Sequence, residues 1–161
     1  MNQIEWNNST LTLHVKKSPV FIRGLLFFIF VFTAIIPIVA FVLNFINGNE
    51  FRLMSVFSLI FFGFLSFRVL RAALWNSYGK EIIVFSNNKI VYTTDFKWFK
   101  DKVKEYECNK LTFTSSRIGY EENDEGLLII YINSEIQLNT VTKIKMPQLT
   151  SLIHQLNETF S

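Results

Sequence analysis

The chain has 161 residues, of which 50% are hydrophobic and 18% are charged, and its formal net charge at pH 7 is +3. The low charged fraction argues against a disordered chain, and so small a net charge does not indicate a nucleic-acid partner. The single cysteine, Cys108, excludes a disulfide-stabilised scaffold.

The first long apolar segment runs from Gly24 to Ile46 without a charged residue. At about 1.5 Å per residue, a helix of this length extends about 34 Å and can cross a hydrocarbon core of roughly 30 Å. Pro37 lies inside the segment, and membrane helices tolerate an internal proline because neighbouring groups satisfy the freed carbonyl. A buried soluble helix would need protein on every side, which the remaining chain can hardly supply. We therefore predict a transmembrane helix over 24–46.

A second apolar segment, 51–74, follows a short polar turn at 47–50 and completes a predicted transmembrane hairpin within residues 20–75. Arginines near the ends of the spans can lay their methylene groups along the hydrocarbon and reach the headgroups, and aromatic residues follow where an interfacial belt is expected. These predicted interfacial anchors are Arg23, Arg68, Arg71, Trp75 and Tyr78. Small residues on the second segment either permit close helix packing or are merely tolerated there. They are Ser55, Ser58, Gly63 and Ser66.

Basic residues flank the hairpin before the first span and at the end of the second, whereas the connecting turn has only Arg52 beside Glu50. By the positive-inside rule, both termini are cytoplasmic. The lone Cys108 agrees with a reducing compartment.

After the hairpin the sequence changes from helical to strand periodicity. Short runs rich in β-branched and aromatic residues predict strands at 81–86, 89–94, 103–108, 111–114, 118–120, 127–132 and 135–138. Asn87 and Asn88 predict a tight turn with positive φ angles. The run 127–132 is the most apolar, which predicts a central strand covered on both faces. Within the N-terminal segment 1–19, residues 10–15 alternate and either add an edge strand or lead into the membrane.

The chain ends in a predicted amphipathic helix, with Pro147 in its first turn. Its apolar stripe consists of Met146, Leu149, Leu152, Ile153, Leu156 and Phe160. A stripe of this kind packs against another element, and the nearest candidate is the open end or face of the predicted sheet.

Short antiparallel strands closed by one C-terminal helix resemble a pleckstrin-homology (PH)-like β-barrel or sandwich. The order of elements is similar to that of bacterial PH-like membrane proteins, including the YcxB-like group. The matching sequences are Gly24–Trp75, EIIVFSNNKIVY (81–92) and MPQLTSLIHQL (146–156). The resemblance implies an α+β inner-membrane protein with two spans and a cytoplasmic PH-like domain over 79–161. It does not carry inositol-lipid recognition, because the first hairpin loop is only Asn87–Asn88 and is not surrounded by basic residues.

No motif indicates catalysis, a cofactor or a metal. His14 and His154 have no partner readable from the sequence, and a packing or surface role is expected for His154. Cys108 lacks metal-ligand spacing, which predicts a half-buried structural thiol. The acidic run 121–125 lacks the alternation of a calcium loop and predicts a solvated turn. We therefore expect a non-enzymatic protein.

One cluster of lysines and aromatic residues allows two interpretations. In a loop facing the bilayer, the rings would enter the interface and the lysines would meet anionic headgroups. In an ordinary solvated hairpin, one ring would point inward and the lysines would protect an exposed edge strand. The second interpretation is favoured, because charge runs usually form solvated surfaces. The cluster comprises Phe96, Lys97, Trp98, Lys100, Lys102, Lys104 and Lys110.

Two functions remain. The first is a membrane-tethered module that binds a membrane or cytoplasmic protein along an open strand edge or a groove beside the final helix. The second is a structural, assembly or accessory subunit, including an immunity-type protein, that acts through its transmembrane hairpin. Either form would have the lipid bilayer as a partner and is compatible with a homo-oligomer.

Overall fold

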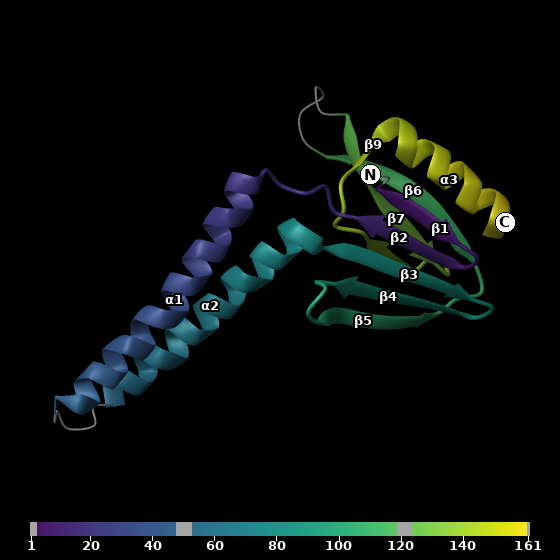
Figure 1. Ribbon diagram of the computed structural model, residues 1–161. Coiled ribbons are helices and arrows are strands. Elements are labelled where there is room, and N and C mark those ends of the chain that lie inside the picture. The colour runs from purple at the N-terminus through teal and green to yellow at the C-terminus, as the bar shows by residue number, and fades with distance from the viewer. Residues whose placement is uncertain (1–2, 48–52, 119–123, 161) are drawn as a thin grey trace. The chain divides into compact units, whose positions relative to one another are not determined.

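The computed structural model describes residues 3–47, 53–118 and 124–160 (Figure 1). The chain divides into two compact units. The helical unit comprises residues 17–77, and the β unit comprises residues 1–16 together with 78–161. The N-terminal residues therefore belong to the β unit, although the helical unit separates them from the rest of it in the sequence.

The helical unit contains α1 (Val20–Ile46) and α2 (Leu53–Tyr78). Both helices are long and apolar enough to span a membrane. In each helix, only 6% of an apolar stretch of 18 residues is buried inside the structure. Pro37 lies inside α1 without ending it. The turn predicted at 47–50 lies mostly outside the described residues.

Contacts between α1 and α2 confirm a close approach at one of the predicted small residues. Ser66 is buried, and its hydroxyl donates to the Phe30 carbonyl at 3.3 Å. Where α1 begins and α2 ends, the Ser18 hydroxyl donates to Asn76 Oδ1 at 2.7 Å. Gly63 has no such role, because a Cβ built there would meet nothing within 4 Å. Ser55 and Ser58 are only partly buried.

Sheet 1 of the β unit is antiparallel, and its five strands follow sequence order. They are β1 (Ile4–Asn7), β2 (Thr10–His14), β3 (Lys80–Ser86), β4 (Lys89–Asp95) and β5 (Lys100–Glu107). The predicted strand at 10–15 is present as β2, but it lies inside the sheet, between β1 and β3. The edge strand is β1, which the sequence analysis missed.

Sheet 2 has β7 (Glu125–Ile132) at its centre, as predicted. Its other strands are β6 (Leu111–Ile118), β8 (Ile136–Asn139) and β9 (Ile144–Lys145). The expectation that the central strand is covered on both faces is wrong, because β7 alternates between buried and partly exposed residues. Ile118 ends β6, and the remainder of the strand predicted at 118–120 lies outside the described residues.

The two sheets pack their inner faces together, and α3 (Met146–Phe160) covers β6, β7 and β9 (Figure 1). Leu149, Leu152 and Leu156 of α3 are buried, which confirms the predicted apolar stripe. Four rings from β1, β3, β6 and α3 form an aromatic cluster: Trp6, Phe85, Phe113 and Phe160. The described strands thus form an α+β sandwich of two open sheets.

The predicted Asn87–Asn88 turn joins β3 to β4, with Ser86 opposite Lys89. Neither asparagine adopts a positive φ, so the expected backbone conformation was wrong. Positive φ angles occur instead at the turns containing Asn8 and Asn133.

A buried carboxylate connects the two sheets. Glu81 of β3 is fully buried and accepts a hydrogen bond from the Tyr92 hydroxyl. It also accepts the backbone N–H groups of Val141 at 2.9 and 3.0 Å and Thr142 at 2.7 Å. Burial, together with the charge of Glu81, raises the pKa of Tyr92, so its phenol stays protonated and donates.

The segment that meets Glu81 is itself fixed to sheet 2. Thr140 is buried, and its hydroxyl donates to the Leu128 carbonyl at 3.0 Å and accepts the Leu128 N–H at 3.1 Å. At another crossing, Asn133 accepts the Asn109 N–H at 2.8 Å and donates to the Glu107 carbonyl at 3.1 Å. Side chains thus hold the connections that pass between the sheets.

We predict that Glu81→Ala lowers the free energy of unfolding by about 3 kcal/mol, because the Tyr92 hydroxyl and two backbone donors lose their acceptor in the core. Glu81→Gln should cost less, since an amide oxygen can still accept from the loop. The measurement is denaturant unfolding of the full chain in detergent, followed by near-UV circular dichroism. Equal losses in both variants would contradict the assigned role of the acceptor.

We predict that Gly126→Ala destabilises the β unit by about 1–3 kcal/mol through overpacking. A Cβ at Gly126 would lie 2.7 Å from Met146 Sδ and 3.0 Å from the Ser116 carbonyl oxygen. Gly63→Ala is the control, because that site has open space. The same unfolding measurement should show a lower midpoint only for the Gly126 variant.

Candidate binding groove

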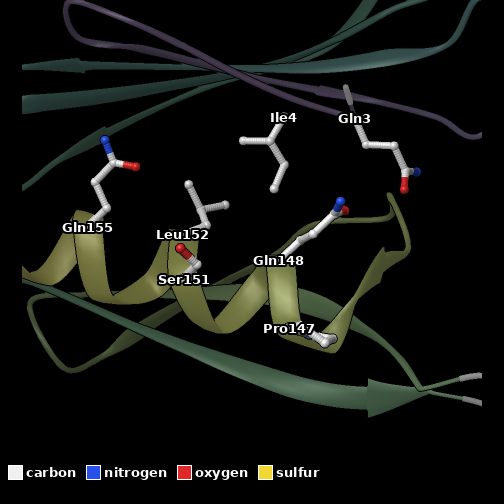
Figure 2. A pocket seen from close by; sticks show the side chains of 7 residues that line it. All are labelled: Gln3, Ile4, Pro147, Gln148, Ser151, Leu152 and Gln155. Atoms are coloured by element: carbon white, nitrogen blue, oxygen red, sulfur yellow. The ribbon is translucent and has the colours of Figure 1, made fainter. Parts of the chain in front are cut away.

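A groove of about 420 Å³ lies between the edge strand β1 and the helix α3 (Figure 2). The side chains of Gln3 and Ile4 enter it from the N-terminal segment, and those of Gln148 and Leu152 enter it from α3. Its lining consists of Gln3, Ile4, Pro147, Gln148, Ser151, Leu152 and Gln155. The groove therefore lies between a segment near the N-terminus and the C-terminal helix.

The lining is apolar at its base and uncharged at its rim. Ile4 and Leu152 pack against the core and supply aliphatic surface. Gln148, Ser151 and Gln155 are exposed and recur on one face of α3. Gln3 is held in place, because its Nε2 donates to the Lys143 carbonyl at 3.2 Å. The rim thus offers amide and hydroxyl groups, which both donate and accept hydrogen bonds.

The backbone of β1 adds a second set of hydrogen-bonding groups. β1 pairs with β2 in the register Ile4↔Leu13 and Trp6↔Leu11, and His14 N–H donates to the Gln3 carbonyl at 2.8 Å. In an antiparallel pair, only alternate residues exchange hydrogen bonds with the partner strand. This register directs the N–H and C=O groups of Ile4 and Trp6 away from β2, toward the outer edge of sheet 1.

An open strand edge beside a helix is suited to an added strand. Main-chain hydrogen bonds to such an edge supply affinity, and the neighbouring pockets select alternate side chains. Here the edge would contribute the backbone of Ile4 and Trp6, and α3 would contribute the amide rim. This geometry is suited to binding an extended peptide.

The sequence suggested a groove beside the final helix as one possible binding site, but it did not identify the residues that line it. β1 has only two apolar residues, Ile4 and Trp6, and their alternation with Glu5 and Asn7 was the one available signal. The polar residues of α3 had the pattern of an ordinary solvated helix face. Their proximity to β1 depends on tertiary structure alone.

The lysine–aromatic cluster is divided by the fold. Phe96 is buried, and its ring stacks on the Phe99 ring with 4.9 Å between the two centroids. Trp98, in the same turn, is 64% exposed. Lys97 lies within this turn, Lys100 begins the exposed edge strand β5, and Lys102 and Lys104 follow along β5. Lys110 lies beyond the other end of β5, where its carbonyl accepts the Asn133 N–H at 2.9 Å.

The residues predicted as interfacial anchors lie in the first turn of α1 and in the C-terminal half of α2. The Arg68 guanidinium lies 5.7 Å from the Phe64 ring, one turn earlier in α2. Tyr78 ends α2 and is 43% exposed, and the Lys97 ammonium lies 4.3 Å from its ring centroid. Arg23, Arg71 and Trp75 are partly buried.

The His, Cys, Asp and Glu side chains among the described residues do not form a cluster that could hold a metal ion. No group of three or more His, Cys, Asp or Glu side chains there could hold a metal ion. His14 Nε2 lies 3.2 Å from Glu5 Oε2, and the exposed His154 pairs with Glu158 one turn later at 3.3 Å. Of the acidic run 121–125, residues 121–123 lie outside the described chain.

Cys108 is buried, and burial raises the pKa of its thiol. Because the thiolate is the reactive form, this environment is that of an inert structural cysteine.

Comparison of the chain with known protein families, curated proteins and solved structures found no match. The resemblance to the YcxB-like group therefore stays a prediction.

We predict that Cys108 in the folded chain reacts with a maleimide at pH 7 at least tenfold more slowly than an exposed cysteine. Asn157→Cys, on the exposed face of α3, provides that reference in the same protein. Mass spectrometry should find one modified thiol in the variant before denaturation and two after it. Rapid labelling of Cys108 in the native chain would contradict its placement in the core.

Proposed function

We propose that this protein is a non-enzymatic, membrane-anchored PH-like module that binds an extended segment of a partner protein. The helices α1 and α2 would cross the bacterial inner membrane, with both termini in the cytoplasm. The β unit would then hold its groove near the membrane surface. Tethering of this kind raises the local concentration of a partner in or near the same membrane.

The membrane assignment is supported by the length and the surface of the two helices. Large apolar side chains such as Phe28, Phe32 and Phe61 are exposed on them, and such a surface is compatible with lipid but unfavourable in water. Basic residues flank the outer ends of the hairpin, which favours a cytoplasmic β unit.

The PH-like assignment is supported by the order of elements. Two antiparallel sheets are followed by one C-terminal amphipathic helix that packs on them. The N-terminal hairpin of β1 and β2 adds to that pattern. Its strand β2 pairs with β3, although the helical unit separates the two strands in the sequence. A fragment starting at residue 79 would lack both strands, so functional tests require the full chain.

The observation that carries the binding proposal is the outward-facing backbone of Ile4 and Trp6 beside the uncharged rim of α3. An extended segment could add to sheet 1 there and place its side chains against Ile4 and Leu152. The rim glutamines would pair with its polar groups. The partner segment would bind without any change to its covalent bonds.

The test uses a photo-crosslinking amino acid at Gln155 in the full-length membrane protein. We expect a specific crosslinked partner that disappears when Ser151→Arg fills the groove. Thr150→Arg is the matched control, because Thr150 is adjacent and exposed but does not line the groove. The crosslink should survive in that variant.

A crosslink unaffected by Ser151→Arg would contradict binding in the groove. Crosslinks obtained only from a probe on the exposed side of α2, for example at Phe61, would instead favour an assembly subunit that acts through the hairpin. Replacing the hairpin by an unrelated pair of spans separates these functions, because only the groove function should survive the exchange.

A further inference from the structure

The turn between β4 and β5 presents one tryptophan on a rigid base. Phe96 N–H donates to the Phe99 carbonyl at 3.0 Å, and the two rings stack beneath the turn. Phe96 is buried, whereas Trp98 is 64% exposed. The turn that carries the exposed ring is therefore packed on an aromatic pair of which Phe96 is buried and Phe99 is half-buried.

The neighbouring Lys97 adopts a φ of 76°, a conformation that favours glycine. Asp95 supports it by accepting the Lys97 N–H on Oδ1 at 2.7 Å. Strained backbone of this kind persists only where surrounding contacts hold it, and it is concentrated at functional sites. Here the result is a charged side chain next to the exposed Trp98.

The turn lies at the end of sheet 1 where the chain leaves for α1 and returns from α2. The register aligns His14 with Lys80, Lys80 with Asp95, and Asp95 with Lys100 in one row across the sheet. His14 ends β2 shortly before α1 begins, and Lys80 begins β3 directly after α2. Chain connectivity therefore keeps this row close to the ends of the two spans.

A direct contact strengthens that placement. The Lys97 ammonium lies 4.3 Å from the ring centroid of Tyr78, the last residue of α2. Tyrosine at the end of a span is typical of the membrane interface. Tyr78 is also the first residue of the β unit after the helical unit, so the turn contacts the point where the chain enters the β unit.

The charge of this region is complementary to an anionic surface. Lys97, Lys100 and Lys102 lie in or next to the turn. Of the two nearby carboxylates, Asp95 lies 3.5 Å from Lys80, and Asp101 accepts the Lys102 N–H at 2.7 Å. The three lysines outnumber these two carboxylates, so the region around Trp98 has a net positive charge.

We propose that the β4–β5 turn is a second membrane contact, in which Trp98 enters the interface of an anionic bilayer and Lys97, Lys100 and Lys102 contact phospholipid headgroups. The inference rests on the proposed membrane anchoring by α1 and α2. It assigns to the β unit a lipid-bound position, which anchoring alone does not require. An aromatic ring at the interface and lysines near anionic lipids both favour this state.

The experiment reconstitutes the full chain in vesicles of phosphatidylcholine with or without 30% phosphatidylglycerol, using brominated lipids as quenchers of tryptophan fluorescence. The signal of Trp98 is the difference between the wild type and Trp98→Phe. A Trp6→Phe/Trp75→Phe chain, with Trp98 as its sole tryptophan, gives the same signal directly. Flotation of the vesicles on a density gradient is measured for each sample.

We expect brominated lipids to quench Trp98 at least twofold more strongly in anionic vesicles, with protection from aqueous acrylamide. Replacing Lys97, Lys100 and Lys102 by glutamine should lower the ratio of docked to undocked β unit about fivefold for each lysine. The control variant Lys89→Gln/Lys110→Gln removes lysines at the opposite end of the sheet. It should leave the quenching unchanged.

Acrylamide access to Trp98 in chains that float with the vesicles would overturn this inference and leave the anchoring intact. Protection from acrylamide without quenching by lipid would also overturn it, because a protein surface would then cover the ring. Failure of the full chain to float would overturn the proposed anchoring and this inference together.

Discussion

The β unit is organised around a buried charge that water cannot reach. The carboxylate of Glu81 lies at the start of β3, and its hydrogen-bond donors are Tyr92 and the backbone of Val141 and Thr142. An uncompensated charge in a core is very unfavourable, so β3 can take its native position only when the segment before β9 is also in place. Because β3 follows α2 directly, this constraint also fixes the first residues that leave the helical unit.

The parts of the fold that could be predicted are those encoded by neighbouring residues. Apolar length alone predicted α1 and α2, and short runs rich in β-branched and aromatic residues predicted β3, β4 and β6. An apolar stripe with helical spacing predicted α3. Glu81 gave no signal, because in the sequence it is one more polar residue at a strand end. Its partners at Val141 and Thr142 are about 60 residues away, and no local pattern connects them.

Proximity in the sequence was misleading for the lysine–aromatic cluster. β5 has eight residues and, at about 3.3 Å per residue, extends about 26 Å. Lys100 and Lys110 therefore cannot belong to one patch, although they are close in the chain. The groove shows the opposite case, since Ile4 and Gln148 are distant in the sequence and adjacent in space. A polar helix face and a groove rim have the same composition, so only the position of β1 distinguishes them.

The positions of the two proposed surfaces make them compatible. β1 and β5 are the opposite edges of sheet 1, and strands about 4.8 Å apart place these edges about 19 Å from each other. A lipid contact at the β4–β5 turn would therefore not need to involve the outer edge of β1. Docking would instead restrict the rotation of the β unit about its linkers and limit the directions in which the groove can face. An extended segment from another protein of the same membrane would then meet a partly oriented edge, which reduces the entropy lost on binding.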